Sequence, residues 1–320
     1  ASTTALSDLN SPLNRNGGNN TSRYNWQLNA DNRANDWYYQ SIGDSSSVAG
    51  ERGDTFIADS KAAGAQAMLT IPLLDWVAKL GVNRSKLASF SIAKYGPQTG
   101  NDWQWFPDAG NGILQSTGQP VSGNNPTDAN VGSSVSFQQG WVQHLINRWG
   151  AASNGGLRYY ILDNEHSIWH STHRDVQPTG ATMDQVRDKM IAYAASIKTV
   201  DPSALVVGPE EWGWSGYFYS GYDQQWGSQN GWSNLPEVWC PVEDDAGASA
   251  DWKLHVHSGD QERVVPLTNG ERSGNMMRYQ PDASELLTLL TPGLHFIQLS
   301  VSRGSRRPQC KEIFKLWVGL

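Results

Sequence analysis

The chain has 320 residues, enough for one large α/β barrel or two ordinary domains, and a core of that size folds without disulfides or metals. Its formal net charge of −7 argues against a nucleic-acid partner or a polybasic membrane anchor, because both need concentrated basic charge. No apolar run approaches the roughly 18–20 residues that a membrane-spanning helix requires.

The first half of the chain is mostly polar. Asn-Gly turns surround residues 16–19, and an aromatic stretch runs from Tyr24 to Tyr39. A helical pattern from Asp54 ends near Gly64, and the apolar run at 67–72 then predicts a buried strand. Residues 96–133, rich in Gly, Asn, Pro and Asp, are expected to be one long loop, and loops of that length usually have a function.

The second half begins with a clear alternation of helices and strands. Apolar residues at helical spacing predict helices over 134–149 and 182–200, and β-branched and aromatic runs predict strands over 157–162 and 204–208. This rhythm is typical of βα units in a parallel sheet. In a barrel of such units the catalytic residues follow the carboxyl ends of the strands, where Glu165, Glu210 and Glu211 fall.

The composition favours an extracellular, sugar-binding protein. Fifteen Trp in a chain with only 17% charged residues suggest aromatic platforms in a wet groove, although a Trp-rich core is an equal alternative for any one Trp. The first residue is Ala1, as expected for a secreted protein after removal of its export signal, and a trimmed chain would look the same. Cys240 and Cys310 are too few for a disulfide framework.

Glu165 is the strongest catalytic candidate. Glycoside hydrolysis needs one carboxylic acid to protonate the leaving oxygen and a second carboxylate as nucleophile or base. Glu165 follows a predicted strand and is preceded by Asn164. In many barrel glycosidases an Asn-Glu pair in this position provides a hydrogen bond to the sugar 2-hydroxyl and the acid/base. The order therefore predicts Glu165 as the proton donor and Asn164 as its substrate-binding neighbour.

Longer segments of the sequence indicate a protein family for this predicted site. The chain resembles glycoside hydrolase family 44 over residues 10–234, through the stretches 23–29, 35–38, 162–175, 208–214 and 217–221. Those enzymes are retaining endo-β-1,4-glucanases and xyloglucanases built as a (β/α)8 barrel that carries a β-sandwich. The resemblance implies Glu165 as acid/base and Asn164 as a substrate contact, and it places Asn25, Trp26, Trp37 and Trp212 near the cleft.

Two departures from the family follow. His166 stands where the family usually has Pro after the catalytic Glu, so the loop is expected to be looser or the pKa of Glu165 shifted. From about Leu235 the family's further βα units are not recognisable, nor is its nucleophile, a Glu that ends the seventh strand. Residues 1–234 are therefore expected to be the amino-terminal part of the barrel. Residues 235–320 are expected to be a divergent segment, explained by an altered reading frame, a truncation or divergence.

Other chemistries compete with this interpretation. His166, His170 and His173 could suggest a zinc site, but no His-Glu-x-x-His order is present, and a polar cleft lining explains them better. No Gly-x-Ser-x-Gly elbow supports a serine hydrolase. Glu210 and Glu211 are expected to be mainly structural.

The sequence thus predicts a secreted, monomeric endo-acting hydrolase of β-1,4-glucan, including xyloglucan, with neither nucleic acid nor membrane as a partner. No cofactor is required, and a structural calcium ion is compatible with the Asp/Asn-rich loops. The alternative from another class is a β-glucan-binding protein that lacks the nucleophile and does not cleave. Sugar release measured beside binding to insoluble glucan discriminates between the two.

Overall fold

The computed structural model describes residues 2–217 and 219–229, and beyond them the backbone of the strands that lie between residues 240 and 318. The chain divides into two compact units, Ala1–Trp212 and Gly213–Leu320, which are described separately. The boundary expected at residue 234 lies outside the described residues.

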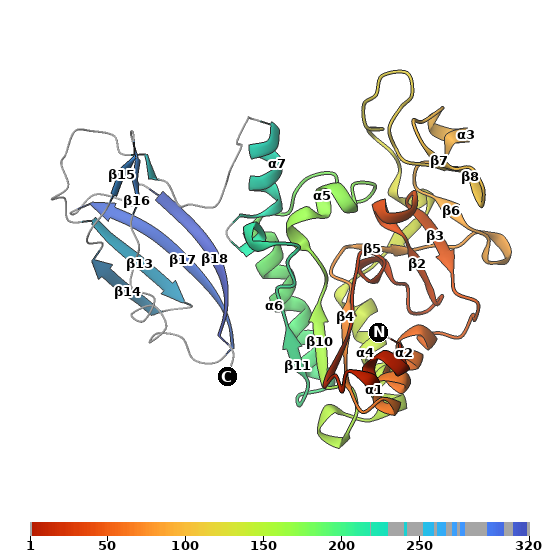
Figure 1. Ribbon diagram of the computed structural model, residues 1–320, viewed down its shortest axis with the longest axis horizontal. Coiled ribbons are helices and arrows are strands. Elements are labelled where there is room, and N and C mark those ends of the chain that lie inside the picture. Colours follow the sequence, from red (N-terminus) through yellow and green to blue (C-terminus); the bar gives the residue numbers. More distant parts are fainter. Residues whose placement is uncertain are drawn as a thin grey trace. The chain divides into compact units, whose positions relative to one another are not determined.

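A four-stranded parallel sheet organises the first unit (Figure 1), in the order β1-β4-β10-β11. Its strands are β1 (Leu13–Asn16), β4 (Gln66–Ile71), β10 (Tyr159–Leu162) and β11 (Leu205–Val207). The predicted strands at 67–72, 157–162 and 204–208 are β4, β10 and β11. No closed barrel is formed by the described part of the chain, so the structure shows the α/β class and the parallel sheet.

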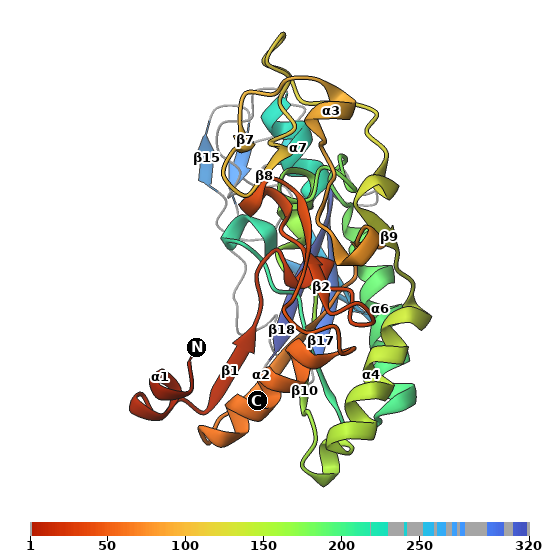
Figure 2. The ribbon, with the colours of Figure 1, turned by 90° about the vertical axis from the view of Figure 1, so that its right-hand side faces the viewer.

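The expected helices connect these strands. They are α2 (Glu51–Ala62), α4 (Val135–Trp149) and α6 (Met183–Val200). Figure 2 shows α4 and α6 side by side, and the two helices pack on each other. The helix starts follow from local chemistry, because the Ser134 and Thr182 side chains accept backbone N–H groups and Thr182 forms a capping box with Gln185. Apolar faces of these helices and strands form the core.

Short helices and short strands fill the segments between these longer elements, and the paired strands among them are antiparallel. They are α1 (Thr3–Asp8), β2 (Ala30–Asn32), β3 (Gln40–Gly43), β5 (Trp76–Ala78), β6 (Leu87–Ala88), α3 (Ile92–Tyr95), β7 (Asn101–Asp102), β8 (Phe106–Gly110), β9 (Asn130–Gly132) and α5 (Trp169–Thr172). The prediction of a single loop over 96–133 was therefore wrong in detail. That segment holds a β7–β8 hairpin and a strand, β9, that pairs with β5. These pairs have only two or three residues each, too few to produce a strand pattern in the sequence.

The second unit contains α7 (Gly221–Gln229) and antiparallel strands. One sheet has the order β12-β16-β15 and the other β14-β13-β17-β18. The strands are β12 (Cys240–Pro241), β13 (Trp252–Ser258), β14 (Gln261–Pro266), β15 (Glu271–Ser273), β16 (Met276–Arg278), β17 (Gly293–Arg303) and β18 (Cys310–Val318). All their pairings are antiparallel, so these strands do not continue the parallel βα pattern of the first unit. None of the described helices is long and apolar enough to span a membrane.

Candidate active site

The loop that follows β10 carries the proposed acid, and Asp163 fixes this loop to the end of β4. The buried Asp163 carboxylate accepts the backbone N–H groups of Leu73 at 2.5 Å and Leu74 at 3.1 Å, and that of Asn164 at 2.7 Å. Asp163 and Glu165 both have left-handed backbones, with φ of 63° and 53°. Non-glycine residues pay for that conformation, so the surrounding hydrogen bonds must hold it in place.

Asn164 is held by groups from the end of β1. Its Oδ1 accepts Arg15 Nη2 at 2.6 Å and the backbone N–H of Gly18 at 3.1 Å, and its carbonyl oxygen accepts the Trp169 indole N–H at 2.9 Å. The amide nitrogen Nδ2 is buried and makes no hydrogen bond of standard geometry with the described residues, although the Asn164 side chain acts on the pKa of Glu165. A buried unpaired donor is costly, and an acceptor oxygen from a bound ligand would relieve that cost.

Glu165 itself is half-buried and is linked to the end of β11. Its backbone N–H donates to the carbonyl oxygen of Glu210 at 2.6 Å. The pKa of the Glu165 carboxyl is raised, chiefly by burial and further by the negative charges of Asp36 and Glu211, while the amide of Asn164 and the charge of Arg15 oppose the rise. A raised pKa keeps a carboxyl protonated, as a general acid requires.

The side chains of the two glutamates after β11 both interact with neighbouring residues. Glu210 forms an ion pair with Arg15 at 3.1 Å. The side chain of Glu211 is buried, accepts the backbone N–H of Ser167 at 3.2 Å, and lies 4.0 Å from Nδ1 of His166. The Glu211 carboxylate and the Glu210 carbonyl oxygen therefore hold the loop that carries Glu165, whereas the Glu210 carboxylate pairs with Arg15.

The three histidines do not form a metal site. No group of three or more His, Cys, Asp or Glu side chains in the described part of the chain is arranged to hold a metal ion. His166 lies beside Glu211, and His173 is buried next to Arg23, with Nη1 and Nδ1 3.4 Å apart. Burial and the charge of Arg23 lower the pKa of His173 to about 3, so its ring is neutral at ordinary pH.

A buried ion pair joins the segment after β1 to the segment after α5. Arg23 and Asp175 are fully buried and form two hydrogen bonds of 3.0 Å each. Asp175 also accepts the Ser89 hydroxyl at 2.6 Å, and Arg23 donates to Asn130 Oδ1 at 2.5 Å. Despite burial, the pKa of Asp175 is lowered, because Arg23 and the Ser89 hydroxyl stabilise the carboxylate.

The other residues expected near the cleft have different surroundings. Asn25 is buried, donates to the carbonyl oxygen of Ala78 and accepts the N–H groups of residues 27 and 28. Trp26 packs on α4, where its indole N–H donates to the carbonyl oxygen of Phe137. None of these contacts is with the loop of Glu165, and the placement of Asn25 and Trp26 near the cleft stays a prediction. Trp212 is 66% exposed and directly follows Glu211.

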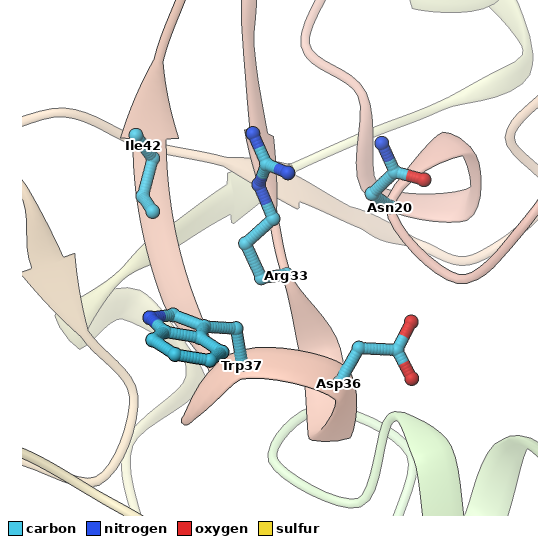
Figure 3. Close-up of a pocket in the computed structure, with 5 residues that line it drawn as sticks. All are labelled: Asn20, Arg33, Asp36, Trp37 and Ile42. Atoms are coloured by element: carbon cyan, nitrogen blue, oxygen red, sulfur yellow. The ribbon is translucent and has the colours of Figure 1, made fainter. Parts of the chain in front are cut away.

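Trp37 does line a pocket. This pocket has a volume of about 460 Å³ and is lined by Asn20, Arg33, Asp36, Trp37 and Ile42 (Figure 3). Trp37 is 44% exposed and stands on the short turn between β2 and β3. This turn packs against α5, which begins four residues after Glu165.

Sequence reasoning missed the residues that hold the proposed acid in place. Arg15, Gly18, Asp36 and Asp163 all act on the loop of Glu165 or on its pKa. Arg15 lies near the end of β1, a polar strand of sequence Leu-Asn-Arg-Asn without apolar alternation. The pairing of Arg15 with Asn164 spans 149 positions in the chain, so no local pattern reveals it.

Comparisons with known proteins show the family to which the chain belongs. The model of "Glycoside hydrolase family 44" matches residues 30–253. The crystal structure of CelM2, a bifunctional glucanase-xylanase from a metagenome library, is 74% identical with a TM-score of 0.71 over 74% of this chain and 45% of that chain. The β-mannanase/endoglucanase A of Caldicellulosiruptor saccharolyticus is 30% identical over 216 residues, which are 63% of this chain and 15% of that protein.

A xyloglucanase structure from Paenibacillus polymyxa shares the fold, with 21% identity and a TM-score of 0.51 over 70% of this chain and 42% of that chain. The chain thus spans less than half of each of these proteins. The match of the family model covers well over half of the 320 residues. The chain belongs to glycoside hydrolase family 44.

Proposed function

We propose that this protein hydrolyses internal bonds of β-1,4-glucan with retention of configuration, and that Glu165 is its acid/base. The raised pKa of Glu165 at the carboxyl end of β10, beside the unpaired amide nitrogen of Asn164, is the observation that carries the proposal. The similarity to a glucanase-xylanase and to an endoglucanase supports the same class of substrate.

The proposed chemistry assigns two states to Glu165. As an acid it gives its proton to the glycosidic oxygen while a second carboxylate attacks the anomeric carbon and displaces the leaving sugar. As a base it then takes a proton from the water that hydrolyses the glycosyl-enzyme. Nδ2 of Asn164 donates to the sugar 2-hydroxyl oxygen, which satisfies the buried donor. In this proposal the parallel sheet is part of a (β/α)8 barrel, and the second carboxylate lies about 5–5.5 Å from Glu165.

The same proposal includes the location, oligomeric state, cofactor requirement and binding partners of the protein. The protein acts outside the cell as a monomer, needs no cofactor for catalysis, and binds glucan or xyloglucan rather than nucleic acid or membrane. Its low fraction of charged residues and its 15 Trp support an extracellular, sugar-binding role.

The test measures cleavage and binding together. Reducing-sugar release from carboxymethylcellulose, xyloglucan and xylan is measured beside pull-down on insoluble glucan. Glu165→Gln should lower turnover about 10²–10⁴-fold, because the amide cannot protonate the leaving oxygen. Glu51→Gln, in the first turn of α2, is the matched control and should keep full activity.

Two results would overturn the proposal. Binding to glucan without any sugar release by the parent protein would identify a binding protein rather than a hydrolase. Unchanged turnover in Glu165→Gln would remove Glu165 from the mechanism.

A further inference from the structure

The β7–β8 hairpin exposes two tryptophans at its tip. Trp103 is 75% exposed and Trp105 is 65% exposed. They flank Gln104, so the three residues of the tip are Trp-Gln-Trp, without a charged side chain. Large apolar side chains grouped on a surface mark interaction sites when the structure holds them there against the cost of exposure.

Hydrogen bonds fix the backbone of this hairpin. Asp102, 3% exposed, accepts the backbone N–H of Trp105 at 3.2 Å. The backbone N–H of Trp103 donates to the carbonyl oxygen of Asn101 at 3.0 Å, and the Asn101 amide closes the hairpin by donating to the carbonyl oxygen of Pro107 at 2.8 Å. The tip is therefore anchored by hydrogen bonds rather than left as a free loop.

The same carboxylate also holds Trp37. Oδ2 of Asp102 accepts the Trp37 indole N–H at 3.2 Å and the side-chain amide of Gln40 at 2.8 Å. One buried aspartate thus binds both the indole of Trp37 and the backbone of Trp105, and Trp37 lines the pocket shown in Figure 3. The turn of Trp37 packs on α5, so Asp102 links the hairpin to a turn that contacts the helix after Glu165.

The absence of charge at the hairpin tip indicates which class of ligand can bind there. An uncharged surface offers nothing to a phosphate backbone, an anionic lipid or an acidic peptide, all of which need cationic partners. A neutral sugar polymer has flat C–H faces that pack on indole rings, while its hydroxyl groups exchange hydrogen bonds with water and with amides such as that of Gln104. We propose that Trp103 and Trp105, together with Trp37, form a binding platform for a neutral β-1,4-linked glucan chain.

This inference rests on the proposed function for the identity of the polymer, and its test separates the two. Native electrophoresis in gels containing hydroxyethylcellulose or xyloglucan gives the dissociation constant for each polymer. Trp103→Ala/Trp105→Ala should raise this constant about tenfold or more, since aromatic anchors dominate such contacts, and each single variant should give part of the effect. Val82→Ala is the control, because Val82 is 83% exposed and lies outside the hairpin.

Each outcome decides one claim. Unchanged retardation of the double variant, with sugar release by the parent intact, overturns the platform and leaves the hydrolase standing. Retardation that depends on the tryptophans without any sugar release keeps the platform and removes the hydrolase. Failure of the parent protein to bind either glucan, or stronger Trp-dependent retardation in a heparin gel, also overturns the platform. Equal thermal midpoints of the parent and the variants show that any loss is not unfolding.

Discussion

The backbone N–H of Glu165 donates to the carbonyl oxygen of Glu210 across 2.6 Å, which joins the loop after β10 to the loop after β11. Because the next residue, Glu211, accepts the N–H of Ser167, the same two loops are joined a second time. The position and the charge environment of the proposed acid are therefore set by its neighbouring strand as much as by its own.

Replacing Glu211 by Gln should move the alkaline limb of the pH–activity profile to lower pH. Burial is the main cause of the raised pKa of Glu165, and the charge of Glu211 adds to it. Without that charge, the acid loses its proton at lower pH, and activity falls earlier as pH rises. The kcat/KM profile on carboxymethylcellulose measures this. A limb that stays in place or moves upward contradicts the assignment.

Replacing Arg15 by Met should move the same limb in the opposite direction. Arg15 lowers the pKa of Glu165, so its loss allows the carboxyl to stay protonated to higher pH. The variant should also lower kcat, because Asn164 loses its hydrogen bond from Arg15. The profile of Arg15→Met measured beside that of Glu211→Gln checks this. Shifts of the same sign in both variants would show that neither charge acts on Glu165.

Replacing Arg23 by Met should lower the free energy of unfolding by about 3–5 kcal/mol, because the substitution leaves the Asp175 carboxylate buried without its cation. Urea denaturation at neutral pH measures this. Arg148→Met is the matched control, since Arg148 is 60% exposed in its ion pair with Asp54, and its loss should cost about 0–1 kcal/mol. Equal losses in the two variants would contradict the burial argument.

His173 should make the protein less stable as the pH falls. Its pKa is about 3 in the folded chain, below the ordinary value of 6.5. Between these values the unfolded chain binds a proton that the folded chain does not, so stability falls by about 1.4 kcal/mol per pH unit as pH decreases through this window. His173→Asn should remove this contribution. Urea denaturation at several pH values compares the slopes, and identical slopes would refute the prediction.

The sequence predicted the elements that obey local rules. Ser134 and Thr182 mark the starts of α4 and α6 because capping side chains act within three residues. The runs that became β4 and β10 are apolar because both faces of a parallel sheet are covered. Glu165 and Asn164 could be proposed as site residues because they follow such a strand directly, and their roles stay a prediction.

Other features escaped prediction because they depend on long-range contacts. The resemblance places Asn25 and Trp26 near the cleft, which stays a prediction, while no local pattern reveals their hydrogen bonds to the carbonyl oxygens of Ala78 and Phe137. The pair of Arg23 and Asp175 joins positions 152 residues apart. Two polar residues in separate segments carry no sign in the sequence that they will be buried together, so only the fold reveals their partnership.

The left-handed backbone of Glu165 implies that thermal stability and catalysis favour different residues at this position. Glycine adopts a φ of 53° without the steric cost that a side chain meets there, and a Glu165→Gly chain would keep the backbone hydrogen bond to Glu210. Such a chain should tolerate more heat than the parent while having no acid to offer the substrate. A screen for heat resistance alone would therefore favour loss of Glu165, and screens for robust variants should require sugar release at every round.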